Sequence, residues 1–309
     1  MATPELTAGA EPRLRARRRR IGEDLVKGAL AACALISVAT TVGIVIALFV
    51  PALEFFREVS LVDFLTGTSW APLFEPAEFG VVPLVAGTLL VTAIASAVAM
   101  PLGLGSAIYL SEYASPRARG ILKPALELLA GIPTIVFGYF ALTFVTPLLR
   151  DLGIQVDIFN TLSAGLVMGV MLMPTVASLS DDAMGAVPRD LRDGAYALGS
   201  TKVQVATRIV VPAAVSGIVA SFVLAISRAV GETMIVLIAM GQQPTLTFDP
   251  RQAAETMTAF IAATGAGDVP TGSLEYKTIF AVGATLFVLT LAMNVVAIRL
   301  VRKYREVYE

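Results

Sequence analysis

Long runs of apolar residues dominate the hydrophobic and polar pattern of this chain. Each run exceeds the 18 or so residues that indicate a membrane-spanning helix, since about 20 residues at 1.5 Å rise cross a hydrocarbon layer of roughly 30 Å. The pattern therefore predicts an all-α integral membrane protein with six transmembrane helices. The runs lie at 28–53, 80–111, 128–149, 158–180, 210–247 and 278–298.

The positions of the basic residues predict the orientation of these helices. Of the 23 Lys and Arg residues, 18 lie in the N-terminal arm, in the two loops near residues 117 and 195, and in the C-terminal tail. Only four lie in the alternate loops, so the positive-inside rule places both termini in the cytoplasm. An even number of spans also requires both termini on one side of the membrane.

The same pattern divides the chain into parts. A basic tail over residues 1–27 precedes the first span and an outside loop at 28–79. A transmembrane domain over 80–300 contains a cytoplasmic loop at 181–212, and residues 301–309 form a short cytoplasmic tail. The basic tail is expected to lie near anionic membrane lipid, with no role in nucleic-acid binding.

Two large loops are expected on the outside, at residues 51–79 and 248–277. The first contains the sole tryptophan, Trp70, which is expected at the outer membrane interface, either as an anchor or within a docking surface for an external partner. The centre of the second loop is expected to form a short interfacial helix before a Gly- and Pro-rich turn. The sequence leaves both interpretations of Trp70 open.

Several classes of chemistry are excluded by composition. The chain has no histidine and one cysteine, Cys33, which rules out His-based acid–base catalysis, His metal sites and thiolate zinc sites. It also has no G-x-x-x-x-G-K-[ST] phosphate loop, no G-x-S-x-G elbow and no H-E-x-x-H motif. We therefore expect a protein that is not an enzyme and holds no cofactor or metal, so that any driving nucleotide binds another chain.

Two charged residues interrupt the fifth apolar run, in the stretch SRAVGETMIV. Arg228 and Glu232 are four residues apart, so they share one helix face and can pair directly. Charges in a membrane normally face a protein interior or a watery cavity. The pair is either a self-neutralising device that holds helices together or part of an oxyanion pathway, in which the guanidinium fork suits phosphate. Gly231 between them is expected to permit close approach of another helix.

The cytoplasmic loop is far longer than a connection between two spans requires. The stretch VPRDLRDGAYALG predicts a short helix that begins near Pro188 and stops at Gly199. Ser200 is expected to cap a second helix that runs into the fifth span. The first helix is expected to present one apolar face, formed by Leu191, Ala195 and Leu198.

The spacing of this loop resembles the EAA loop of ABC importer permeases, E-A-A-x3-G-x9-I-x-L-P. Every interval is kept, with Asp for Glu, Gly for the first Ala and Val for Leu. In that family the loop forms a coupling helix that seats in a groove of the ATPase subunit. The resemblance implies the same role here, with Ala195 facing the ATPase. The matching residues are Asp193, Gly194, Ala195, Gly199, Ile209 and Pro212.

Longer stretches resemble the PstC family, the C-type permease of the phosphate-specific ABC importer. GTLLVTAIASAVAMPLGLGSAIYLSEY, ELLAGIPTIVFGYFALTFVTPLLR and SRAVGETMIV carry a resemblance that covers about residues 60–305. It implies a type I importer permease (MetI-like) fold in a bacterial inner membrane, and a transport role for Arg228 and Glu232. It also implies a PstA-like sister permease, two PstB-like ATPases that bind the ATP, and an external PstS-like phosphate-binding protein.

Two alternative functions stay open at this point. An importer of another oxyanion, such as tungstate or sulfate, is one, because an arginine in the membrane attracts any of them. A self-sufficient secondary carrier is the other, with Arg228 and Glu232 as a titrating relay driven by an ion gradient. Such a carrier has no reason to keep the spacing of the cytoplasmic loop.

The predicted topology can be tested by cysteine labelling. In a Cys33→Ala chain, single cysteines in place of Ser69 and Ser200 are expected to face opposite sides of the membrane. An impermeant maleimide added to intact cells should label position 69, and position 200 should react only after the membrane is opened. Equal labelling of both positions from outside would contradict the six-span orientation.

Overall fold

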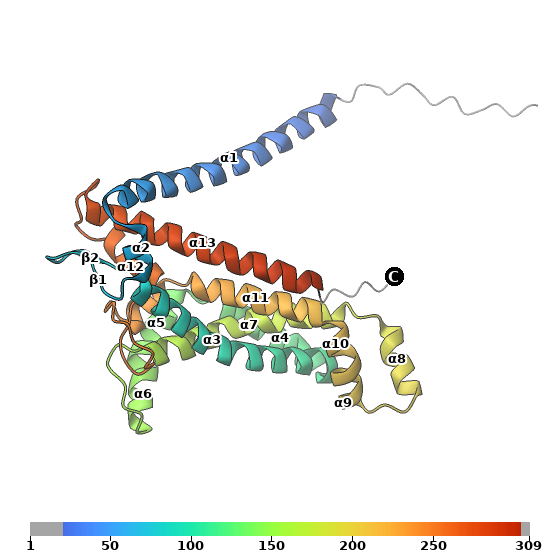
Figure 1. Cartoon of the computed structure of the whole chain (residues 1–309). Coiled ribbons are helices and arrows are strands. Elements are labelled where there is room, and N and C mark those ends of the chain that lie inside the picture. Colours follow the sequence, from blue (N-terminus) through green and yellow to red (C-terminus); the bar gives the residue numbers. More distant parts are fainter. Residues whose placement is uncertain (1–20, 304–309) are drawn as a thin grey trace, which may run out of the picture. The chain divides into compact units, whose positions relative to one another are not determined.

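The computed structural model describes residues 21–303, which are mostly helical (Figure 1). The chain divides into two compact units, residues 1–47 and 48–309. In the described part of the first unit the chain forms helix α1 (Ile21–Glu58), which continues into the second unit. Residues 28–53 of this helix carry no charged side chain, as a lipid-facing segment requires. All other elements belong to the second unit.

The elements of the second unit follow one another with short connections. From the end of α1 to the third span they are α2 (Leu61–Thr66), β1 (Trp70–Ala71), β2 (Glu78–Phe79), α3 (Val82–Ile108), the π-helix η1 (Tyr109–Tyr113), α4 (Pro116–Ala130), α5 (Thr134–Phe140), η2 (Ala141–Val145) and α6 (Thr146–Asp151). The rest are α7 (Thr161–Gly185), α8 (Arg189–Ala197), α9 (Lys202–Val205), η3 (Ala206–Val210), α10 (Val211–Ala213), α11 (Val215–Val230), η4 (Val236–Met240), α12 (Met257–Gly265) and α13 (Leu274–Lys303). The two strands pair antiparallel, with Trp70 opposite Phe79.

Six segments can cross a membrane if each of two bent helix pairs is counted as one span. Four described helices are long and apolar enough by themselves, at Glu23–Glu58, Val82–Tyr113, Thr161–Gly185 and Leu274–Arg299. The third span bends by 88° between α4 and α5, where Pro133 cannot continue the helix before it. The fifth bends by 70° around Ala214. The described helices thus provide four to six candidate spans, which agrees with the predicted six when each bent pair crosses the membrane once.

Helices α3 and α7 pack together through glycines that accept side chains of the opposite helix. A β-carbon added to Gly169 of α7 would lie 2.6 Å from Cβ of Val98, and one added to Gly165 would lie 2.7 Å from Cγ2 of Ile94. In return, Gly103 of α3 leaves room for Val176. Small residues four apart let membrane helices approach closely, so van der Waals contact holds this pair together.

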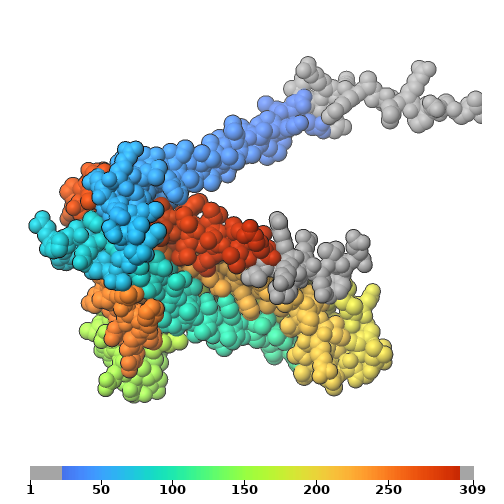
Figure 2. Space-filling model, in the orientation of Figure 1, coloured from blue at the N-terminus to red at the C-terminus, as the bar shows by residue number. Residues whose placement is uncertain are grey.

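The outer segments and the cytoplasmic loop lie at opposite ends of the second unit (Figure 2). At the outer end, Trp70 is only 3% exposed and lies between the rings of Phe64 and Phe260, with centroids 6.1 and 5.0 Å away. Of the two interpretations left open for Trp70, the structure contradicts the anchor at the membrane interface, because its ring fills an aromatic core.

The short helix predicted within the second outside loop exists as α12, but it is not interfacial. Its first residues, Met257 and Thr258, are buried. The Met257 amide donates to Thr88 Oγ1 of α3 at 3.1 Å, and Thr258 Oγ1 donates to the Glu232 carbonyl at 2.6 Å. Hydrogen bonds to two other segments of the unit thus fix α12 inside the protein.

The cytoplasmic loop contains the predicted helix as α8. Pro188 is its N-cap, and Gly199 adopts φ +83°, a left-handed conformation that stops a helix and suits glycine. The next helix is capped by Thr201, where Ser200 was expected. The side chains of Thr201 and Gln204 each accept the backbone amide of the other residue, which forms a capping box. Helix α9 therefore begins one residue later than predicted.

The glycine contact between α3 and α7 can be tested by adding bulk. Gly169→Val should force Val98 and the α3 backbone to shift, at a cost of about 1–3 kcal/mol, because overpacking strains a filled contact. Thermal unfolding of the purified chain in detergent would measure the loss. Gly105→Val is the control, since a β-carbon at Gly105 meets nothing within 4 Å. Equal stability of both variants would contradict the packing argument.

Candidate transport pathway and coupling site

Arg228 lies in the last turn of α11 and is exposed in this chain. Its Nη1 donates to Thr175 Oγ1 of α7 at 3.3 Å. Within residues 21–303 no carboxylate oxygen lies within 4.0 Å of its guanidinium, so its charge is not neutralised there by an ion pair. A guanidinium of this kind offers several hydrogen-bond donors to an anion.

Glu232 does not pair with Arg228, because the helix between them ends. Helix α11 stops at Val230 with Gly231 as its C-cap, and helical structure resumes at Met234. Glu232 Oε1 instead accepts the amides of Met234 at 3.1 Å and Ile235 at 3.3 Å. Its buried carboxylate therefore caps the next helical segment, as an acid at a helix N-terminus favours. The predicted direct pair is wrong for this reason.

Gly231 has a different role from the one predicted. A β-carbon at this position would meet only carbonyl oxygens of its own preceding turn, the nearest being that of Ser227 at 3.7 Å. Within the described chain no other helix approaches it. The residue marks a second break in the fifth span, beyond the bend at Ala214, and this break separates Arg228 from Glu232.

A pocket of about 350 Å³ lies among α4, α7 and α11. Its walls are mostly apolar, and Thr175, the partner of Arg228, contributes to them. Lys123 of α4 and Asp181 of α7 also line it. The pocket thus connects the surroundings of Arg228 with a group of charged residues near the cytoplasmic loop.

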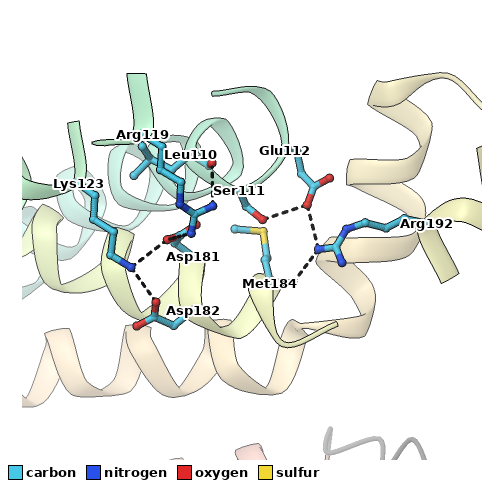
Figure 3. Close-up of polar contacts among 9 residues, drawn as sticks. All are labelled: Leu110, Ser111, Glu112, Arg119, Lys123, Asp181, Asp182, Met184 and Arg192. Carbon is cyan, nitrogen blue, oxygen red and sulfur yellow. Dashed lines mark hydrogen bonds and ion pairs between the residues drawn. The ribbon is translucent and has the colours of Figure 1, made fainter. Parts of the chain in front are cut away.

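Asp181 is the centre of this charged group (Figure 3). Its side chain is 1% exposed, and Oδ2 accepts Arg119 Nη2 at 2.8 Å and Lys123 Nζ at 3.2 Å. Lys123 also reaches Asp182 Oδ1 at 2.9 Å, and Arg119 Nη1 donates to the Leu110 carbonyl at 3.2 Å. Burying an acid is costly unless it is paired, so these contacts hold α4 and η1 against the end of α7.

Arg192 joins the helix of the cytoplasmic loop to two spans (Figure 3). From α8, its Nη1 donates to the Val187 carbonyl at 2.7 Å, and Nη2 donates to the Met184 carbonyl at 2.8 Å and to Glu112 Oε1 at 3.1 Å. Glu112 lies on η1, next to α3, and its side chain is only 5% exposed. One guanidinium therefore satisfies carbonyls at the end of α7 and ties α8 to η1.

The structure buries some of the predicted coupling residues and exposes others. Ala195 is 6% exposed and belongs to a buried cluster with Met184, Val205 and Val210, against which Ile209 packs. Its methyl group packs against this chain's own cluster, and the expected contact of Ala195 with the ATPase stays a prediction. Asp193, Gly194 and Pro212 are exposed, and a side chain at Gly194 would meet nothing within 4 Å.

The apolar face expected of α8 is also divided. Leu191 is 38% exposed and Leu198, beyond the helix end, is 89% exposed, whereas Ala195 is buried. Tyr196, which the sequence did not single out, is 43% exposed. Exposed apolar side chains thus flank the buried Ala195, and Asp193 is exposed on the same helix.

The family described as binding-protein-dependent transport system inner membrane component matches residues 99–306. The chain belongs to this family. It is 35% identical to the probable ABC transporter permease protein YqgH of Bacillus subtilis, over 92% of this chain and 93% of that protein. It is 31% identical to the phosphate transport system permease protein PstC of Mesorhizobium japonicum, over 91% and 90% respectively. The PstC of Haemophilus influenzae is 29% identical, over 92% and 94%.

Solved structures agree on the fold of this permease. It superposes on a chain of a bacterial ABC transporter involved in alginate import with a TM-score of 0.64 at 17% identity, over 93% of this chain and all of the other. It also superposes on a chain of the MetNI methionine ABC transporter, with a TM-score of 0.56 at 18% identity. That match covers 74% of this chain and 95% of the other. The predicted type I ABC importer permease fold is confirmed.

The charged residues around α8 were missed by sequence reasoning. Arg192 and Glu112 are 80 residues apart in the chain, and no motif joins them. A weak signal existed in the neighbouring acids Asp181 and Asp182, which end an apolar run and require basic partners. The sequence could indicate that partners exist but not which basic residues of the permease they are.

The link through Arg192 can be tested in the assembled importer. Arg192→Gln should leave a complex that hydrolyses ATP but transports poorly, because α8 loses its attachment to α7 and η1. The substitution also leaves the Glu112 carboxylate without its basic partner. Breaking a buried ion pair in this way should lower the free energy of unfolding by about 2–5 kcal/mol. The ratio of substrate imported to ATP hydrolysed, measured in proteoliposomes, is the readout.

Arg189→Gln provides the matched control on the same helix. Arg189 is exposed at the start of α8, and its substitution removes the same charge without touching Glu112. It should keep a normal ratio of transport to ATP hydrolysis. A normal ratio in Arg192→Gln, in an intact complex, would show that the contacts of Arg192 are not needed for coupling.

Proposed function

We propose that this chain is a permease subunit of an ABC importer for inorganic phosphate in a bacterial inner membrane. With a PstA-like sister permease it forms the pathway across the membrane. Two PstB-like ATPases in the cytoplasm bind and hydrolyse the ATP, and a PstS-like binding protein delivers phosphate from outside. The names of the PstC relatives, similar over about nine-tenths of the chain, support this assignment.

The observation that carries the proposal is the guanidinium of Arg228. Arg228 lies in the last turn of α11, just before a break in the fifth span. Its guanidinium donates a hydrogen bond to Thr175 and has no carboxylate within 4.0 Å among the described residues. A positive charge in a membrane protein is costly and normally serves a pathway or a partner. Since it is exposed in this chain, the surface around Arg228 is available to line a pathway shared with the sister permease.

The coupling role of the cytoplasmic loop forms the second part of the proposal. Asp193, Gly194, Ala195, Gly199, Ile209 and Pro212 keep the spacing of the importer loop. Of these, Ala195, Gly199 and Ile209 shape and support α8 and its surroundings, and the exposed residues near Asp193 contact the ATPase. In this way movement of the ATPase reaches the spans through α8.

The geometry of Glu232 argues against a self-sufficient secondary carrier. A titrating relay needs a carboxyl that gains and loses a proton during transport. Glu232 Oε1 instead accepts two backbone amides, so its carboxylate is engaged in capping a helical segment. The cytoplasmic loop also has no use in such a carrier.

Substitution of Arg228 tests the pathway role. In proteoliposomes with all partner subunits, Arg228→Gln should abolish phosphate uptake, and Arg228→Lys should restore only part of it because a point charge lacks the guanidinium fork. Uptake of radiolabelled phosphate is the measurement, and yield of the assembled complex is measured separately. Sulfate and tungstate uptake in the same vesicles would reveal an importer of another oxyanion.

Glu232→Gln is the informative companion variant. Its amide oxygen can still accept the hydrogens of Met234 and Ile235, so assembly and uptake should largely persist if Glu232 only caps a helix. Loss of uptake in an intact complex would instead indicate a titrating role. Normal phosphate uptake by Arg228→Gln would refute the pathway role of Arg228.

A further inference from the structure

A second pocket, of about 330 Å³, lies among the outer segments, apart from Arg228 and the cytoplasmic loop. Three segments form it: the stretch from β1 onward, the connection after η4, and the end of α12 with the turn that follows. Its walls include the rings of Trp70 and Phe260, which contact each other edge to face. We call it the outer pocket.

Glu255 contributes a buried carboxyl group to the outer pocket. The residue is 5% exposed, and its carboxylate has no hydrogen-bond donor within the described part of the chain. Burial raises the pKa of this carboxyl to about 7. A buried acid without a partner is unfavourable in the free protein, so the arrangement suits a group that enters from outside and supplies the missing positive charge.

The charges around the outer pocket specify the sign of that group. Asp268 is the other charged residue among those that line it, and no described Lys or Arg does so. Arg251, on the same connection as Glu255, directs Nη2 to Asp249 at 2.7 Å. Where the backbone of Glu255 meets α3, the neighbouring residues Gly87 and Thr88 are uncharged. The pocket therefore favours a cation.

The surroundings of the pocket indicate that this cation belongs to a protein. No group of three or more acidic, His or Cys residues that could hold a metal ion occurs among the described residues. Leu73 and Phe74, which also line the pocket, are 61% and 72% exposed. Exposed apolar and aromatic side chains around a charged pocket are typical of a protein–protein contact.

We propose that the outer pocket receives a lysine or arginine side chain of the external binding protein, with Glu255 as its carboxylate partner and Asp268 as a second attraction. The identity of this occupant rests on the proposed function, because an importer of this kind works with an external binding protein. The contact places the binding protein on the segment from Trp70 to Phe74 and on α12. Because α12 donates a hydrogen bond to the carbonyl of Glu232, this docking site is in direct contact with the break in the fifth span.

The test uses the complete importer in proteoliposomes with its purified binding protein. ATP hydrolysis is measured against the concentration of binding protein, and the half-saturating concentration reports docking. Glu255→Gln should raise that concentration about tenfold or more, since a charge-assisted contact is lost. Hydrolysis without binding protein should be unchanged. Glu78→Gln, an exposed residue of β2 outside the pocket, is the control and should have no effect.

The pH dependence of docking gives an independent readout. At pH 8 the Glu255 carboxyl of the empty pocket is ionised, and at pH 6 it is mostly neutral, because its pKa is about 7. Docking through a cation should therefore be about tenfold weaker at pH 6 than at pH 8. In Glu255→Gln this difference should disappear. A pH dependence that persists in Glu255→Gln assigns the effect to another group and overturns the proposal.

The partner residue is identified by substituting each surface lysine and arginine of the binding protein with glutamine. One such variant should weaken docking to the unaltered importer about as much as Glu255→Gln does, and should have no further effect on the Glu255→Gln importer. Normal stimulation of Glu255→Gln by the unaltered binding protein would overturn the proposal and leave the importer assignment intact. If no binding protein stimulates the unaltered importer, the proposed function itself fails.

Discussion

The capping of the fifth span by Glu232 is the interaction on which the central part of the structure depends. A helix that breaks inside a membrane leaves backbone amides and carbonyls that lipid cannot satisfy. Here the Glu232 carboxylate accepts two of those amides, and Thr258 donates to the carbonyl of the same residue. The break is therefore stable, and α12 is fixed inside the unit. Because Glu232 is engaged in these contacts, it does not pair with Arg228.

Helix α7 connects the two functional regions. Its Thr175 accepts from Arg228, its Asp181 receives Arg119 and Lys123, and its Met184 carbonyl receives Arg192 of α8. Thr175 and Met184 are nine residues apart, about 14 Å along a helix. One helix, with no loop in between, therefore joins the contact of Arg192 to the threonine that Arg228 hydrogen-bonds.

Features that depend on local sequence were predictable, and features that depend on distant contacts were not. Apolar run lengths gave the six spans, and Gly199 gave the end of α8 because its left-handed conformation is a local requirement. The pairing of Arg228 with Glu232 failed because the i, i+4 rule assumes an unbroken helix. The burial of Trp70 depends on Phe64 and on Phe260, which is 190 positions away in the chain, and no local pattern contains that contact.

The glycine contacts between α3 and α7 restrict how this permease can move. Ile94 and Val98 lie in notches of the opposite helix, so sliding one helix along the other drives these side chains into the backbone. The pair therefore resists sliding and stays together as one unit. The 88° bend between α4 and α5 and the 70° bend before α11 are the places where the chain offers a joint. Any change in the angle between spans is therefore expected at these two bends, while α3 and α7 keep their contact.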